Sequence, residues 1–120
     1  MPIWRVGKSG FRFNAMHSFP NDGGYDRNPH GHDYELTILV EGTRAAGEML
    51  LDTRELKALV DEHVIAALDH RDLNQVLPDP STEALAEWIW QRLRPRISAH
   101  VRLGIHLWET RTTSVEFWGD

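Results

Sequence analysis

The sequence has no cysteine, and this absence excludes disulfides, thiolate metal ligands and a cysteine nucleophile. No apolar run approaches the roughly 20 residues of a membrane span, and Met1–Arg5 does not begin an apolar leader. No cluster of lysine and arginine interrupts a formal net charge of −5, so neither nucleic acid nor an anionic membrane surface is expected as a partner. These absences favour a soluble cytoplasmic protein.

The composition suits a single folded domain. The chain has 120 residues, of which 41% are hydrophobic, and this is enough for one modest core. We find no linker, low-complexity segment or internal repeat in the sequence, so residues 1–120 are predicted to form one domain.

Alternating and helical hydrophobic patterns predict the secondary structure. Asp52 is followed at the third position by Glu55, which is typical of a helix start, and Ser81 begins a second helix that Pro95 ends. A Gly-Lys-Ser-Gly turn composition is predicted to break the first extended region. In chain order, the predicted elements are extended segments 3–7 and 11–17, a strand over 31–42, the two helices, and a hairpin pair over 99–109 and 112–118.

The order strand, strand, helix, helix, strand, strand predicts an α+β fold with a four-stranded antiparallel sheet. The two helices can cover one face of that sheet. The other face then needs a partner, and we expect a second copy of the chain rather than a monomer.

Three histidines form the strongest candidate site. His30 and His32 stand two positions apart on a predicted strand, so their imidazoles project from the same face, and His17 ends an earlier extended segment. Three imidazoles with no cysteine nearby suit a metal site that keeps one position open for water or substrate, whereas a structural zinc has four closed ligands. The alternative is that each histidine is a surface residue or a satisfied core residue.

Five motifs occur in order between residues 11 and 118, and each alone is weak. Together they resemble the 6-pyruvoyl-tetrahydropterin synthase family, which includes 6-carboxy-tetrahydropterin synthase. The resemblance implies the tunnelling fold, with trimeric barrels that stack into a homo-hexamer and active sites between subunits. The motifs are Phe13-Asn14-Ala15-Met16-His17, His30-Gly31-His32-Asp33-Tyr34, Leu68-Asp69-His70-Arg71-Asp72-Leu73-Asn74, Pro80-Ser81-Thr82-Glu83 and Trp108-Glu109-Thr110.

The resemblance also implies a zinc ion held by His17, His30 and His32, and a reduced pterin such as dihydroneopterin triphosphate as the substrate. Zinc in that position would act as a Lewis acid on the side-chain oxygens of the substrate.

Other residues match substrate-binding positions of the family. Glu109 matches the glutamate that holds the pterin ring, a task that suits a carboxylate facing two N–H donors. Its alternative role is a hairpin carboxylate that is exposed or paired with Arg111. Thr82 and Glu83 match further positions of the pterin pocket, and their alternative role is to stabilise the start of the second helix.

Asp69 and His70 match the proton relay of the family. A carboxylate beside a histidine can orient the imidazole and raise its basicity, which suits general acid–base catalysis. The alternative for His70 is a favourable interaction with a helix C-terminus.

The chain departs from the family at the expected catalytic cysteine, which stands four or six residues before His-Gly-His. Asp26 and Gly24 occupy those two positions, and Arg27 stands where a subset of the family has glutamate. Asp26 is therefore the candidate replacement base, although an aspartate pKa of about 3.9 makes it weak unless burial raises it. Its alternative is an exposed loop residue.

These features predict a zinc-dependent lyase that acts on the side chain of a reduced pterin. Loss of the cysteine favours cleavage or elimination over the complete reaction of a pyruvoyl synthase. Two alternatives stay open: a family member that binds a pterin or purine-like ring without turnover, and a zinc hydrolase, in which Glu109 and Thr82 would have no clear use.

Overall fold

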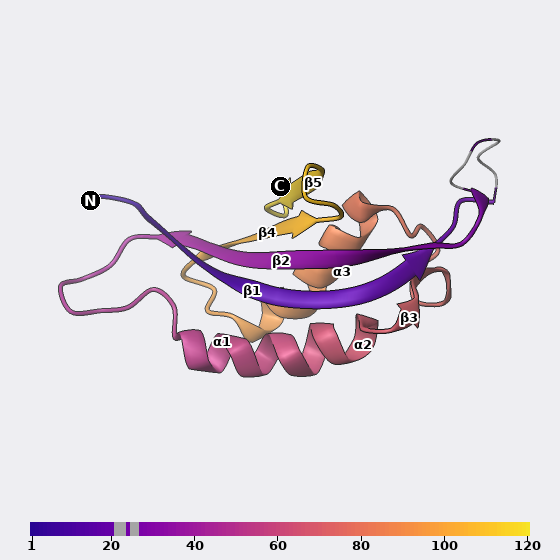
Figure 1. Ribbon diagram of the computed structural model, residues 1–120. Coiled ribbons are helices and arrows are strands. Elements are labelled where there is room, and N and C mark those ends of the chain that lie inside the picture. Colours follow the sequence, from indigo (N-terminus) through magenta and orange to yellow (C-terminus); the bar gives the residue numbers. More distant parts are fainter. Residues whose placement is uncertain (21–23, 25–26) are drawn as a thin grey trace.

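The computed structural model of the protein describes residues 1–20, 24 and 27–120. These residues form one five-stranded sheet with the strand order β3-β1-β2-β4-β5. Two long strands run along most of the molecule, and the helices lie to one side of them (Figure 1). The strands are β1 (Trp4–His17), β2 (His30–Gly42), β3 (Arg71–Asp72), β4 (Arg102–Trp108) and β5 (Ser114–Phe117).

β1 and β2 pair antiparallel from Trp4 opposite Gly42 to His17 opposite His30. The predicted break in the first extended region was wrong, because β1 continues through it with a shift of register between Lys8 and Phe11. Gly10 lies in that shift with a φ of +94°, a conformation that glycine adopts without strain. The turn-like sequence therefore forms a bulge within a long strand.

The predicted four-stranded antiparallel sheet was wrong in one respect. β1, β2, β4 and β5 are antiparallel neighbours, but β3 adds a fifth strand that runs parallel to β1. Two hydrogen bonds join this segment to the backbone of Asn14: the Asn14 N–H donates to the side-chain Oδ1 of Asp69 over 2.9 Å, and the His70 N–H donates to the Asn14 carbonyl over 2.6 Å. A strand of two residues carries no hydrophobic period that a sequence pattern could reveal.

The first predicted helix begins at Asp52, whose side chain accepts hydrogen bonds from the backbone N–H groups of Arg54 and Glu55. It runs without interruption through α1 (Thr53–Val60), a π-helical segment (Asp61–Ile65) and α2 (Ala66–Leu68). In Figure 1 these three parts form one long coil below the sheet.

The second predicted helix is α3 (Thr82–Leu93). The Ser81 side chain accepts a hydrogen bond from the Ala84 N–H at its start, as the sequence predicts for a capping serine. A 3-10 turn over Arg94–Arg96, which contains Pro95, ends the helix. Both predicted helices are therefore confirmed.

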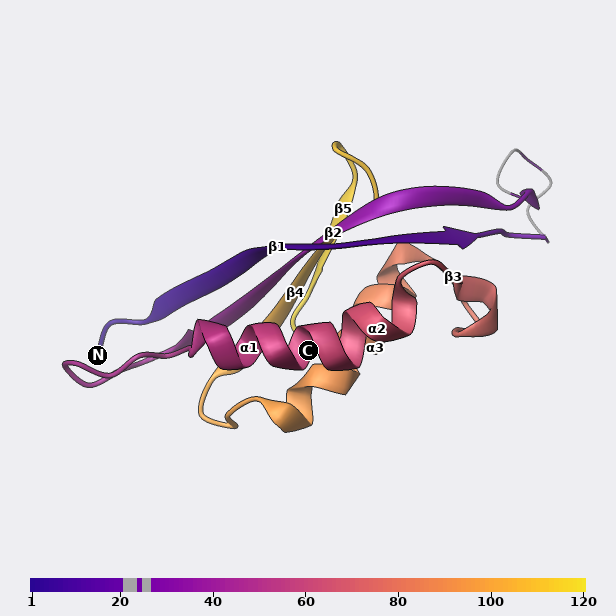
Figure 2. The same ribbon diagram turned by 60° about the horizontal axis from the view of Figure 1, so that its bottom comes forward.

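All the helices lie on one side of the sheet, as Figure 2 shows. Alternate residues of β1 and β2 point into the apolar layer between helices and sheet. In β1 these residues are Phe11, Phe13, Ala15 and His17, and in β2 they are His30, His32, Tyr34, Leu36, Ile38 and Val40. The candidate metal ligands thus continue the core stripe of both strands to one end of the sheet.

The opposite face of the sheet carries mainly polar side chains at its exposed positions along β1 and β2, such as Arg12, Asn14, Asp33 and Glu35. Asn14 Nδ2 donates to Asp33 Oδ1 over 2.7 Å across the two strands. Among the described residues, no helix combines the length and the apolar character needed to cross a membrane.

Candidate active site

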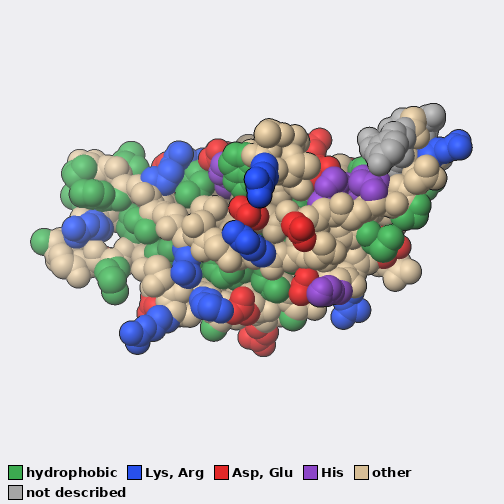
Figure 3. Space-filling view, viewed as in Figure 1, with side chains coloured by type: hydrophobic (Ala, Val, Ile, Leu, Met, Phe, Trp, Pro, Cys, Tyr) green, Lys and Arg blue, Asp and Glu red, His purple; other side chains and the backbone are tan. Residues whose placement is uncertain are grey.

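The pairing of β1 with β2 brings the three predicted metal ligands together. His17 lies opposite His30, and His32 lies opposite Ala15 two residues further along. The ring centroids of the three histidines are 4.6 to 5.1 Å apart, and one nitrogen from each ring lies within 4.8 Å of the others. Figure 3 shows histidine side chains gathered at this end of the molecule. Below we call His17, His30 and His32 the histidine triad.

Backbone carbonyls fix the orientation of two triad rings. His17 Nδ1 lies 2.8 Å from the carbonyl oxygen of Pro80, and His30 Nδ1 lies 2.9 Å from that of Asn28. A carbonyl oxygen only accepts hydrogen bonds, so both rings carry a proton on Nδ1, and in the neutral form of each ring Nε2 presents the lone pair that a metal ion needs. Metal-ligating histidines are held in the same way.

The burial of His17 also favours a metal ligand at this position. Its side chain is only 1% exposed, and its Nε2 has no hydrogen-bond partner among the residues that the structure describes. A buried polar atom left in that state costs about 1–3 kcal/mol. A divalent ion with nitrogen ligands, such as zinc, fits this donor set.

Glu109, the predicted ring anchor, lies beside the triad. It directly follows β4, where its backbone N–H donates to the Thr113 carbonyl over 3.0 Å and closes a tight turn. Its Oε1 lies 3.1 Å from His32 Nε2 and 4.0 Å from His17 Nε2. The structure therefore brings together a carboxylate and an imidazole cluster that are far apart in the sequence.

Thr82 and Glu83, the other predicted substrate-binding residues, differ in their environment. Thr82 is 4% exposed on the first turn of α3, and its hydroxyl donates a short hydrogen bond to Glu109 Oε2. The side chain of Glu83 is exposed on the same turn, where its charge favours the start of the helix. Thr82 is thus held against the candidate anchor, and Glu83 lies at the surface.

Asp69 and His70, the predicted proton relay, lie where the chain leaves α2 and joins β3. His70 has a φ of +60°, the left-handed conformation that costs a non-glycine residue about 1–3 kcal/mol. Its side chain is 74% exposed, and its Nδ1 lies 3.9 Å from Asp69 Oδ2. The imidazole of His70 therefore faces solvent within this single chain.

A hollow of about 700 Å³ joins several of these residues. His32, Asp69 and Glu109 all contribute to its lining. The remaining lining includes Arg12, Asn14, Asp33, Glu35, Thr110 and Arg111. One member of the triad, the anchor candidate and one member of the relay thus border a common space.

Sequence reasoning did not single out Tyr34. This side chain is fully buried and packs edge-to-face on His32 at 5.7 Å and in a stack on Phe13 at 5.0 Å. Burial, with a smaller contribution from the charge of Glu109, raises the pKa of Tyr34 above its ordinary value. The signal was present in the strand pattern, because residues 30, 32 and 34 share one face.

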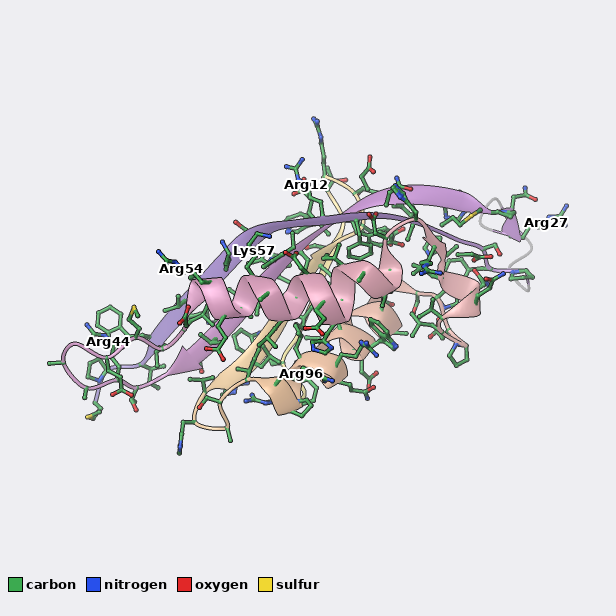
Figure 4. All side chains as sticks on the ribbon, turned by 90° about the horizontal axis from the view of Figure 1, so that it is seen from below. Arg12, Arg27, Arg44, Arg54, Lys57 and Arg96 are labelled. Carbon is green, nitrogen blue, oxygen red and sulfur yellow. The ribbon has the colours of Figure 1, made fainter. Side chains whose placement is uncertain are left out.

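The candidate base Asp26 lies outside the described residues. The neighbouring positions are partly described, and the Arg27 N–H donates to the Gly24 carbonyl over 3.5 Å. Figure 4 shows the Arg27 side chain projecting outward at the end of the molecule where β2 begins.

The fold is that of 6-pyruvoyl tetrahydropterin synthases. The enzyme of Caenorhabditis elegans superposes with a TM-score of 0.83 at 21% identity, over 100% of this chain and 98% of that chain. The enzyme of Plasmodium falciparum gives a TM-score of 0.77 at 19% identity, over 97% of this chain and 98% of that chain.

Sequence comparison identifies the family itself. The sequence model of 6-pyruvoyl tetrahydropterin synthase matches residues 6–120, and the chain belongs to this family. A dihydroneopterin monophosphate aldolase of Pyrococcus furiosus is 40% identical over 88 residues, which are 72% of this chain and 75% of the relative. A 6-carboxy-5,6,7,8-tetrahydropterin synthase of Synechocystis is 35% identical over 98 residues, which are 76% of this chain and 75% of the relative.

Proposed function

We propose that this protein is a zinc-dependent lyase that cleaves a carbon–carbon bond in the side chain of a reduced pterin phosphate, such as dihydroneopterin mono- or triphosphate. The observation that carries this proposal is the buried Nε2 of His17, which has no hydrogen-bond partner among the described residues and lies within a three-histidine cluster beside Glu109. The 40% identity to a dihydroneopterin monophosphate aldolase supports carbon–carbon cleavage in preference to elimination of phosphate.

The absence of cysteine points in the same direction. Family synthases use a cysteine to move protons along the side chain, and this chain has none. Cleavage needs one hydroxyl to lose its proton and one carbon to gain a proton. These are fewer proton transfers than the reaction of a family synthase requires. A zinc ion held by the triad would polarise the side-chain oxygens and lower their pKa.

Glu109 and Thr82 are proposed to bind the pterin ring. A carboxylate can accept from two adjacent ring N–H groups in a bidentate contact. The hydrogen bond from Thr82 to Glu109 orients that carboxylate, and the burial of Thr82 keeps water from competing for it. The ring would then lie beside the triad with its side chain directed at the histidines.

Asp69 and His70 are proposed to move the protons. In an aldol-type cleavage, a base takes the proton from the second side-chain hydroxyl, and the bond between the first and second carbons breaks. Its electron pair moves into the conjugated ring, the phosphorylated aldehyde leaves, and the first carbon is protonated. His70 suits both transfers, because an imidazole accepts and returns a proton near neutral pH.

The exposure of His70 favours an active site completed between subunits. Its 74% exposed ring faces solvent in one chain, so a neighbouring chain would bring its own relay to this triad. In the described sheet, β3 pairs with β1 only at Ala15 and Met16, and β5 forms the other edge. Free strand edges pair readily with other chains, which fits the proposed homo-hexamer built from two trimers.

Product identification by mass tests this function. The zinc-loaded protein should convert a dihydroneopterin phosphate into a shortened pterin and a phosphorylated aldehyde. The His70→Ala variant should bind the substrate without turning it over. Unchanged substrate at full zinc occupancy would contradict the proposal.

The missing cysteine also favours a second candidate, a family member that binds a pterin or purine-like ring without turnover. In that case the wild type and the His70→Ala variant should bind the substrate with equal affinity, and neither should form a product. The same experiment therefore separates the two functions.

A further inference from the structure

The carboxylate of Glu109 lies within coordinating range of the triad. Its Oε1 is 3.1 Å from His32 Nε2 and 4.0 Å from His17 Nε2. Ligands of a tetrahedral zinc with bonds of 2.0–2.1 Å stand roughly 3.3 Å apart. The oxygen of Glu109 thus has the spacing of a further metal ligand, in addition to its suitability for a pterin ring.

The surroundings of Glu109 hold this oxygen in place. The Thr82 hydroxyl occupies the other carboxylate oxygen, Oε2, which leaves Oε1 directed at the histidines. The backbone N–H of Glu109 is tied to Thr113, and Thr110 Oγ1 accepts from the N–H of Thr113 over 3.1 Å. Both the side chain and the turn that carries it are therefore fixed.

We propose that Glu109 is the fourth ligand of the zinc ion in the resting protein, and that it leaves the ion when a pterin ring binds. The second half of this inference rests on the proposed function. Oε1 is the oxygen directed at the histidines, and a ring that pairs its two N–H groups with Oε1 and Oε2 would take the same oxygen as the ion. The ring and the ion then compete for Glu109, and each lowers the affinity for the other by the same factor.

A different explanation of the short contact is an ion pair between Glu109 and a protonated His32 in metal-free protein. This explanation gives Glu109 no part in holding zinc. The two explanations therefore differ in how substitution of Glu109 changes metal affinity, which can be measured without any turnover.

The test measures zinc affinity of the full chain by competition with a chelator. Glu109→Gln keeps the size of the side chain and removes its charge, and should weaken zinc binding by at least about tenfold, because even outer-shell partners are worth 10–100-fold. Glu35→Gln is the matched control. Glu35 lines the same hollow, but its side chain is 56% exposed and pairs with Arg12 at 3.3 Å. Its substitution should leave zinc affinity within about twofold, because water and salt screen exposed charges.

Cobalt-substituted protein gives a second readout. The visible absorption bands of Co²⁺ should shift in Glu109→Gln and keep their wild-type form in Glu35→Gln. Addition of pterin, the ring without a side chain, should shift the wild-type bands and weaken zinc binding to the wild type. Glu109→Asp, which retracts the carboxylate by one carbon, should fall between wild type and Glu109→Gln, and serves if the Gln variant does not fold.

Unchanged zinc affinity and unchanged cobalt bands in the folded Glu109 variants would overturn the inference. That result can occur while the wild type still cleaves pterin phosphates, so it leaves the proposed function standing. Conversely, zinc binding could be weaker in Glu109→Gln while the wild type cleaves no pterin phosphate. That result would support Glu109 as a zinc ligand and contradict the proposed function. A wild-type zinc affinity that pterin does not change would overturn the competition between ring and ion.

Discussion

The Nδ1–H of His17 donates to the carbonyl oxygen of Pro80 over 2.8 Å, although 63 residues separate the two in the sequence. This bond fixes the ring of His17 with Nε2 directed at the other triad histidines. It also ties the end of β1 to the segment that leads into α3 and its Thr82. The residues proposed to hold zinc and those proposed to bind the pterin ring are thereby held in fixed positions relative to one another.

Removal of zinc should destabilise the protein, because His17 links the proposed zinc site to the segment that leads into α3. Zinc at a hundred times its Kd adds about 2.7 kcal/mol to the free energy of unfolding, which for a domain of this size raises Tm by about 10 °C. Differential scanning fluorimetry with and without a chelator should show this shift in the wild type and not in His17→Ala. His106→Ala is the control, since His106 contacts Ser114 Oγ at 3.1 Å and should keep the zinc-dependent shift. An equal zinc-dependent shift in Tm in both variants would contradict the role of His17 as a zinc ligand.

The backbone conformation of His70 predicts that substitutions at this position differ in stability although all of them lose turnover. Its φ of +60° is costly for a residue with a Cβ atom and costs glycine little. His70→Gly should therefore be about 1 kcal/mol more stable than His70→Ala, while both variants lose turnover. Urea unfolding and product assays measure the two effects. Equal stability of the two variants would show that the left-handed backbone carries no strain.

Removal of the Tyr34 hydroxyl should not lower stability. Within the described part of the chain this buried hydroxyl has no hydrogen-bond partner, so Tyr34→Phe removes an uncompensated polar group. We expect the free energy of unfolding to stay the same or rise by about 1 kcal/mol. Chemical denaturation measures this change, and a loss of more than about 1 kcal/mol would contradict the environment described for the hydroxyl.

Glu41 should make stability depend on acid pH. Hydrogen bonds from Arg5, then from Arg102, lower the pKa of Glu41 below its ordinary value. A carboxylate with a lowered folded pKa contributes stability above its unfolded pKa of about 4.3 and loses that contribution as pH falls through the folded pKa.

The wild type should therefore lose more stability than Glu41→Gln when the pH is lowered from 6 to about 3, below the unfolded glutamate pKa. Urea unfolding at the two pH values gives the comparison, and raised salt should reduce the difference because both arginine partners are half-exposed. Parallel losses in both proteins would contradict this role.

Local signals in the sequence predicted the helix starts and the common face of His30 and His32. Asp52 and Ser81 act on N–H groups two or three residues away, so the caps can be recognised from neighbouring residues alone. The spacing of His30 and His32 fixes their common face in the same local way.

The features that sequence reasoning missed depend on contacts between distant segments. The bulge at Gly10 and a true turn have the same composition, and only the pairing with β2 decides between them. β3 is held beside β1 because the backbone of Asn14 binds the Asp69 side chain and the His70 N–H in the segment that follows α2. The left-handed backbone of His70 could not be predicted from its residue type, because only a small share of residues other than glycine adopt it.

The central claim is a zinc site built from His17, His30 and His32, and X-ray absorption at the zinc edge tests it most directly. Zinc-loaded protein should show the scattering pattern of three imidazoles with Zn–N distances of about 2.0–2.1 Å, and His17→Ala should lose that pattern. A protein that takes up no zinc, or one whose bound zinc is surrounded by oxygen ligands alone, would contradict the account.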